Sequence, residues 1–104
     1  MKAKIVYITA PNFGEARKIG LGLLEKKLCA CINIIPNISS IYLEDGKIEE
    51  INEAILLCKT EKSKLPKITK TVKELHFYET PCIKAIDAEQ LNEDYSKWMK
   101  KTMK

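Results

Sequence analysis

The loop that follows the second predicted helix carries the side chains best suited to chemistry. His76, the only histidine, precedes Tyr78 and Glu79, and Pro81 stiffens the loop. An imidazole beside a carboxylate can bind a borderline metal ion or transfer a proton. One histidine does not complete a metal site, because catalytic zinc needs about three protein ligands. Either a Glu or Cys of a neighbouring chain completes the site, or His76 caps its helix and interacts with the helix dipole.

The other charged stretches do not form a catalytic set. Glu49 and Glu50 follow a predicted turn, and adjacent residues of a strand point to opposite faces. Residues 59–61 (Lys-Thr-Glu) end a predicted strand and either line a cleft or form a solvated end. The chain has no glycine-rich phosphate loop and no Gly-x-Ser-x-Gly nucleophile elbow. We therefore predict that it is not an enzyme.

Cysteine usage indicates buried thiols rather than disulfides or zinc. Cys29 and Cys31 lie two residues apart in a strand-like run, so both should point to one face, about 6.6 Å apart. Parallel side chains at that separation are poorly placed for a disulfide. Zinc sites usually leave at least two residues between paired cysteines. We therefore expect small buried thiols at all four positions: Cys29, Cys31, Cys58 and Cys82.

The charge pattern favours a solvated surface over a nucleic-acid partner. The formal net charge of +4 comes almost entirely from dispersed lysines, and Arg17 is the only arginine. The longest uncharged stretch, residues 28–43, contains a proline and several polar side chains, so we expect no membrane span. The N-terminal residues show no cleavable leader pattern, which makes a cytoplasmic location the expectation.

Hydrophobic periodicity predicts four strands and three helices. Strands are expected at residues 4–10, 28–43 with a break at Pro36-Asn37, 48–59 and 82–88. Helices are expected from Asn12 to about residue 27, from Ser63 to about residue 75, and from Asn92 onward. The first strand is apolar throughout and should be buried on both faces. Gly20 and Gly22 should let the first helix lie close to the sheet.

This order of elements predicts one domain over residues 1–104. Two strand–helix–strand units joined by a hairpin, followed by an extra C-terminal helix, give the α+β, ferredoxin-like split βαβ sandwich (βαββαβ). Its four strands should form an antiparallel sheet with two helices on one face. The C-terminal helix should bury Tyr95, Trp98 and Met99.

The hairpin around Asp45-Gly46 makes a monomer look incomplete. Each arm extends about seven residues, or roughly 23 Å, beyond Pro36. An isolated two-stranded ribbon is marginal in water, yet this one is rich in apolar residues. These residues are Ile38, Ile41, Tyr42, Leu43, Ile48 and Ile51. We expect the ribbon to pack on a neighbouring chain in a closed, symmetric oligomer, the alternative being a bent hairpin that covers its own sheet.

Six segments together resemble the CutA divalent-cation tolerance family. Along the chain they are T-A-P (9–11), L-C-A-C-I-N-I-I-P (28–36), S-I-Y-L-E-D-G-K-I-E-E (40–50), L-L-C-K-T (56–60), L-H-x-Y-E-T-P (75–81) and D-Y-x-x-W (94–98). The match covers nearly the whole chain, in order and at the spacing of the family. It implies a ferredoxin-like homotrimer, with long hairpins that join strands across subunits, and a role in tolerance to Cu²⁺ and other divalent cations. No established enzymatic activity comes with the family.

The resemblance carries over one candidate metal ligand, His76. Ile8 and Leu75 stand where some family members offer a Cys and a first His, so a Cys-His-His copper site does not follow from matching positions. Tyr78 and Glu79 are added to His76 as candidates because of their proximity in the chain.

Two functional hypotheses follow, with a purely structural assembly protein as a third. The leading one is a trimer that binds Cu²⁺ or related ions at intersubunit clefts containing His76. The other is a non-enzymatic regulatory module that binds a small molecule or a protein partner in the same clefts. That module would use Tyr42, Glu50 and Lys59, together with Tyr78.

Overall fold

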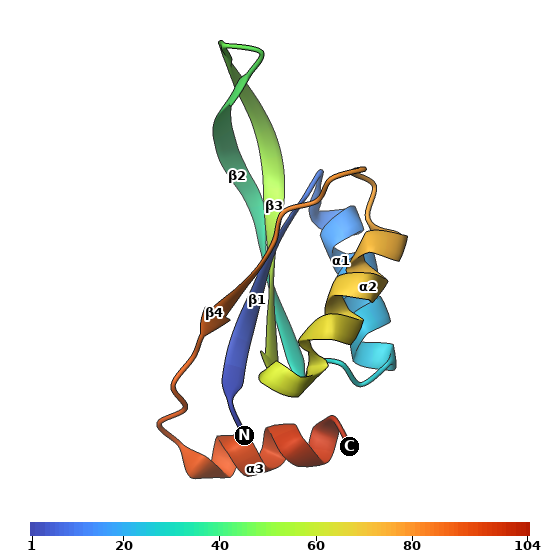
Figure 1. Cartoon of the computed structure of the whole chain (residues 1–104), viewed down its shortest axis with the longest axis vertical. Helices are drawn as coiled ribbons and strands as arrows, with labels where there is room; N and C mark the ends of the chain where they lie inside the picture. Colours follow the sequence, from blue (N-terminus) through green and yellow to red (C-terminus); the bar gives the residue numbers. More distant parts are fainter.

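The computed structural model describes residues 1–104, which fold as a four-stranded sheet with three helices (Figure 1). The elements in chain order are β1 (Ala3–Ala10), α1 (Phe13–Glu25), β2 (Cys31–Glu44), β3 (Lys47–Glu61), a 3-10 turn (Lys62–Lys64), α2 (Leu65–Leu75), β4 (Ile83–Asp87) and α3 (Glu93–Thr102). None of the helices has the length and apolar content needed to cross a membrane.

The sheet confirms the predicted fold class. Its strand order is β2-β3-β1-β4, and every neighbouring pair is antiparallel. Helices α1 and α2 lie together on one face of the sheet, and α3 crosses its lower end (Figure 1). This is the split βαβ arrangement expected from the order of elements.

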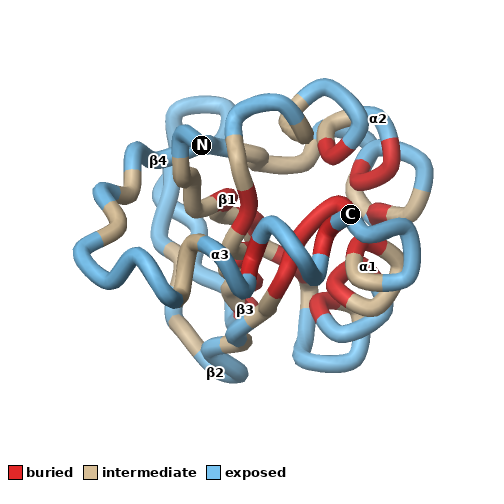
Figure 2. Tube along the Cα trace, turned by 90° about the horizontal axis from the view of Figure 1, so that it is seen from below, coloured by how far each residue is buried: buried red, intermediate tan, exposed pale blue.

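The core lies between the sheet and the α1–α2 layer, where the buried segments gather (Figure 2). Alternate residues of β1, namely Val6, Ile8 and Ala10, point into it and are buried. The intervening residues of β1 are only partly buried, because no helix covers most of that face. The prediction that β1 is buried on both faces is therefore wrong for the single chain.

Glycine allows α1 to approach both of its neighbours. A Cβ at Gly20 would lie 2.5 Å from Cδ1 of Ile32 in β2, which confirms the predicted close approach to the sheet. A Cβ at Gly22 would instead lie 2.7 Å from Cδ1 of Leu75, so this glycine serves the contact with α2. At the start of α1 the Asn12 side chain accepts a hydrogen bond from the backbone N–H of Glu15, as the sequence predicts.

Strand β2 begins three residues later than predicted. The backbone N–H of Leu28 donates to the carbonyl of Leu23, so Leu28 completes the end of α1, and the first bond to β3 is the one from the N–H of Ala30 to the carbonyl of Lys59. Cys29 consequently precedes the strand and does not share a strand face with Cys31. Cys29 and Cys58 are buried as expected, whereas Cys31 and Cys82 are only partly buried, and all four are free thiols.

The second and third helices differ from expectation in their details. Ser63 lies in the 3-10 turn and its hydroxyl donates to Glu61, so it does not cap α2. The Asn92 side chain caps α3 as predicted, by accepting from the N–H of Asp94. Of the three side chains expected to be buried by α3, Met99 is buried, Tyr95 is partly buried and Trp98 is 46% exposed.

The outer parts of β2 and β3 form a hairpin that extends away from the body (Figure 1). The register shifts at a bulge between Ile35 and Ile38, which confirms the break predicted at Pro36-Asn37. Asp45 and Gly46 have φ angles of 51° and 77°, as a two-residue type I′ turn requires. The molecule measures 46 × 26 × 22 Å. The hairpin does not fold back over its own sheet, so that alternative is wrong, and Leu43 and Ile48 are 73% and 75% exposed.

Candidate functional site

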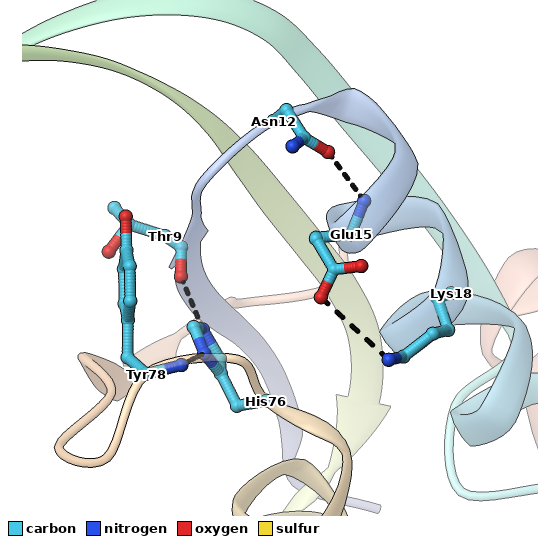
Figure 3. A network of polar contacts seen from close by, with 6 residues as sticks. All are labelled: Thr9, Asn12, Glu15, Lys18, His76 and Tyr78. Carbon is cyan, nitrogen blue, oxygen red and sulfur yellow. Dashed lines mark hydrogen bonds and ion pairs between the residues drawn. The ribbon is translucent and has the colours of Figure 1, made fainter.

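The loop between α2 and β4 is attached to the end of β1 by the ring of His76. Backbone N–H of His76 donates to the carbonyl of Val72 and ends α2. Its Nε2 lies 2.7 Å from the carbonyl oxygen of Thr9, and its Nδ1 accepts from the backbone N–H of Tyr78 at 2.9 Å (Figure 3). Because a carbonyl only accepts, the proton resides on Nε2 and the imidazole is neutral in this arrangement.

These contacts give His76 a positioning role. The residue is 9% exposed, and neither ring nitrogen presents a free lone pair, since Nε2 carries the proton and Nδ1 already accepts a hydrogen bond. A metal ion would gain access to Nδ1 only after the bond from the Tyr78 N–H opened. In the chain as folded, His76 fixes the loop against β1.

Tyr78 reaches from this loop to β3, where its hydroxyl donates to Glu53 at 2.7 Å. Burial and the hydrogen bond to the Glu53 carboxylate raise the pKa of Tyr78, with a smaller contribution from the nearby Tyr42. The phenol therefore stays protonated at neutral pH and is a hydrogen-bond donor, not an anionic ligand. Its function in this geometry is to orient Glu53.

Sequence reasoning missed Glu53, the carboxylate at the centre of this site. The residue is 8% exposed, and its only hydrogen-bond donor among the side chains is Tyr78. Glu53 pairs with Ile38, the first residue of β2 beyond the bulge. The predicted break in β2 was a signal for this residue, because a bulge changes the direction in which the neighbouring side chains point.

The remaining candidates lie in two separate places. Glu79 is exposed on the loop, and Tyr42 and Glu50 lie on the hairpin. Lys59 lies nine residues after Glu50 on β3, roughly 30 Å away at the rise of a strand. Within one chain Tyr42 lies close enough to Tyr78 to raise its pKa slightly, whereas Lys59 lies at the other end of β3.

The hairpin also differs in charge from the rest of the chain. Residues 38–53 contain five carboxylates and one lysine, a formal net charge of −4 in a protein of net charge +4, which leaves +8 for the other residues. Glu79 of the loop adds a further negative charge at the same end. Such a concentration of one sign attracts counter-ions, here cations.

A single chain does not provide a complete metal-coordination sphere. No group of three or more His, Cys, Asp or Glu side chains is arranged so that it could hold a metal ion. Among the buried thiols, a hydrogen bond with Cys29 and burial raise the pKa of Cys58, so that it remains a thiol, whereas metals bind the thiolate. The donors of one chain therefore do not fit a closed metal site, and a tightly held ion would need ligands from a second chain.

The fold and the site define a class of ferredoxin-like α+β proteins with a protruding acidic hairpin and a histidine-fixed loop at its base. The family model "CutA1 divalent ion tolerance protein" matches residues 4–102, and the chain belongs to this family.

Individual relatives agree with this assignment. The divalent-cation tolerance protein CutA of Thermococcus kodakarensis is 44% identical over 99% of this chain and 98% of its own length. The CutA homolog of Xenopus laevis is 44% identical over 89% of this chain, which spans 62% of that longer protein. The solved structure of the periplasmic divalent cation tolerance protein CutA from Archaeoglobus fulgidus superposes with a TM-score of 0.93 at 40% identity, over 98% of this chain and 99% of that one.

Proposed function

We propose that this protein acts in divalent-cation tolerance as a homotrimer that binds cations, with Cu²⁺ the first to test, at clefts between subunits. The proposal rests on the hairpin, which carries a net charge of −4 and uncovered apolar side chains on one two-stranded ribbon. Cu²⁺ is the first candidate because nitrogen and oxygen sites generally bind it more tightly than other divalent first-row ions.

Assembly is supported by the apolar surface of the hairpin. Large side chains on it are between 38% and 75% exposed, namely Ile41, Tyr42, Leu43, Ile48 and Ile51. An isolated ribbon gains little stability in water, and its unpaired outer edge favours association with another strand. Packing against neighbouring subunits would stabilise the ribbon and cover its unpaired edge, and cyclic closure limits the assembly to a defined size. The trimer is the ring that the family resemblance implies.

Cation binding is supported by the carboxylates that such packing would enclose. Glu50 and Glu53 of the hairpin and Glu79 of the loop supply oxygen ligands at the same end of the molecule, where Tyr42 also lies. Tyr78 orients Glu53, and His76 would join as a ligand only after its bond to the Tyr78 N–H opens. Lys59 would share this cleft only if a neighbouring subunit brought it there.

We further propose that the protein is not an enzyme and is cytoplasmic. The family description names tolerance to divalent ions and no reaction. The four cysteines are free thiols, which suits a reducing compartment.

Light scattering combined with Cu²⁺ titration calorimetry tests the proposal. The full chain should have about three times its 11.9 kDa mass and should release or absorb heat with Cu²⁺. The double variant Glu50→Gln/Glu53→Gln should weaken Cu²⁺ binding at least about tenfold, whereas the matched exposed-carboxylate variant Glu89→Gln should not.

Three outcomes separate the alternatives. A monomer in dilute solution overturns the assembly proposal. Negligible Cu²⁺ heats in a stable trimer overturn cation binding, and thermal shifts with small metabolites but not with metal ions would then favour the regulatory module. An equal loss of Cu²⁺ binding in His76→Ala, with the oligomer intact, would show that the His76 ring is released to the metal.

A further inference from the structure

A groove lined by lysines lies in the helix layer, along α2 and beside the end of α1. Its volume is about 390 Å³, within the range of roughly 300–1,000 Å³ typical of small-molecule sites. Helices α1 and α2 lie together on one face of the sheet (Figure 1), so assembly through the hairpin would leave the outer surface of this layer uncovered. The groove therefore belongs to each chain by itself. Its polar side chains are Lys26, Lys64, Lys67, Lys70, Thr71 and Glu74.

This groove carries an excess of positive charge that the chain does not neutralise. Four lysines line it together with one carboxylate, that of Glu74, which gives a formal charge of +3. The ion pairs of the chain are Lys4–Asp87 and Lys18–Glu15, so neither Glu74 nor any other carboxylate is in ion-pair contact with the four lysines. Lysines that are dispersed along the sequence are thus brought together by the packing of two helices.

Two features hold the ammonium groups of α2 close together. Lys67 and Lys70 are three residues apart, a spacing that makes them neighbours on the helix surface, with Cβ atoms about 5–6 Å apart. Lys64, three residues before Lys67, is partly buried, and its Nζ donates to the backbone carbonyl of Met103 at 3.4 Å. Like charges at this spacing repel each other. A ligand with several negative charges would relieve the repulsion at more than one lysine at once.

The rest of the lining favours a small, highly charged anion over other ligands. Leu28 is the only large apolar side chain of the groove, so an apolar body would find little surface there. The groove has no aromatic ring on which a base could stack and no arginine for bidentate base contacts. An ammonium group binds phosphate as a point charge and needs no fixed orientation to do so.

We propose that this groove binds a short inorganic polyphosphate, a linear chain of at least three phosphate units. Its oxygens pair with Lys64, Lys67 and Lys70 along α2, and with Lys26 from the end of α1. The carboxylate of Glu74 opposes the ligand and limits its affinity. The site differs from the acidic hairpin end in its position and in the sign of the ligand charge, so it is independent of cation binding there.

Calorimetric titration of the full chain with sodium tripolyphosphate in metal-free buffer tests the site. One tripolyphosphate should bind per chain with a Kd of about 0.1 mM in about 0.02 M NaCl, and about tenfold more weakly in about 0.2 M NaCl because salt screens the charges. Inorganic phosphate, which is too short to reach several lysines, should bind at least about tenfold more weakly than tripolyphosphate.

Two double variants with the same change of charge separate the groove from the overall charge of the protein. Lys67→Gln/Lys70→Gln should weaken tripolyphosphate binding at least about tenfold. Lys18→Gln/Lys73→Gln removes two lysines of the same two helices that do not line the groove, and should change the affinity less than about twofold. An equal loss in both variants, or full affinity in Lys67→Gln/Lys70→Gln, would overturn the proposal. Equal affinities for tripolyphosphate and inorganic phosphate would also overturn it.

Glu74→Gln provides a test in the opposite direction. Removing the only carboxylate of the groove should tighten tripolyphosphate binding about threefold, a gain that a poorly folded variant would not show. If a double variant does not keep the native mass, Glu74→Gln decides the question. An affinity that stays the same or falls in Glu74→Gln would contradict the proposed site.

Discussion

The two ends of β3 differ in almost every property although they belong to one continuous strand. The first six residues of β3 are exposed, and burial begins abruptly at Glu53 and Ala54. The hairpin end is acidic and uncovered, whereas the other end is covered by α1, α2 and α3 and holds Lys59 in a cavity. The division falls opposite the bulge between Ile35 and Ile38.

This difference shows that one strand can serve two separate purposes. The body half of β3 presents alternate residues to the core, so its side chains are selected for packing. The hairpin half has no core of its own, and its apolar and acidic residues are free to meet another chain or an ion. Substitutions of the same chemical type should therefore have different consequences at the two ends.

The largest expected effect comes from removing a core leucine. Leu56→Ala removes a fully buried side chain and should lower the free energy of unfolding by about 2–5 kcal/mol. The matched variant Leu43→Ala on the hairpin should leave the stability of the dissociated chain within about 0.5 kcal/mol. Urea unfolding at several protein concentrations measures both. If both variants lost a similar amount of unfolding free energy at every protein concentration, the division between body and hairpin would be contradicted.

A smaller loss is expected at the lower end of β3. The hydroxyl of Thr60, which is fully buried, donates to the carbonyl of Leu28 at 2.6 Å. Thr60→Val keeps the shape but leaves that carbonyl unpaired, which should cost about 1–3 kcal/mol of unfolding free energy. Thr69→Val, which removes a partly buried hydroxyl bonded within α2, is the control and should cost less than about 1 kcal/mol. Equal losses of unfolding free energy in the two variants would show that the buried hydrogen bond of Thr60 contributes no more stability than that of Thr69.

The base of the hairpin should show a pH-dependent effect. The pKa of Tyr78 is raised in the folded state, so the unfolded chain releases this proton first as the pH rises. Stability contributed by the Tyr78–Glu53 bond is therefore present below about pH 10, the ordinary range of tyrosine, and is lost above it. Tyr78→Phe should cost about 1–2 kcal/mol at pH 7 and less at pH 11. A cost that does not fall between these pH values would contradict the assigned hydrogen bond.

The smallest effect is expected at the ion pair beside the cavity. Asp87 is fully exposed, and its hydrogen bond and charge interaction with Lys4 lower the pKa of its carboxyl below the ordinary 3.8. Its contribution to stability is present above that ordinary value and disappears as the pH falls through the lowered one. In Lys4→Met the carboxyl titration followed by NMR should move back towards 3.8, with stability at pH 7 nearly unchanged. If the titration of the Asp87 carboxyl did not change in Lys4→Met, Lys4 would not be the partner of Asp87.

Sequence patterns predicted the fold well because its determinants are local or periodic. The Asn12 cap, the Asp45-Gly46 turn and the alternation in β1 each follow from the properties of short segments. The start of β2 was misplaced because the end of α1 takes up Leu28, a tertiary choice that strand propensity does not encode. The burial of Trp98 by α3 was overestimated for a similar reason, since apolar spacing predicts a face but not what covers it.

The candidate site was only partly accessible to the same reasoning. His76 and Tyr78 were singled out because their residue types are rare and chemically versatile. Their actual partners, the carbonyl of Thr9 and the carboxylate of Glu53, lie 67 and 25 residues away in the chain. Contacts of that separation depend on sheet register and loop placement, so they emerge only from the folded structure.

The two residues at the hairpin tip have an influence that extends well beyond the turn. Both Asp45 and Gly46 adopt left-handed backbone angles, a combination that few residue pairs tolerate at low cost. A tip that preferred a three-residue turn would slide one arm by a single position and exchange the inward and outward sides of all seven outer ladder pairs. Substitutions of Asp45 and Gly46 that change the turn would therefore alter the orientation of side chains up to seven ladder pairs away.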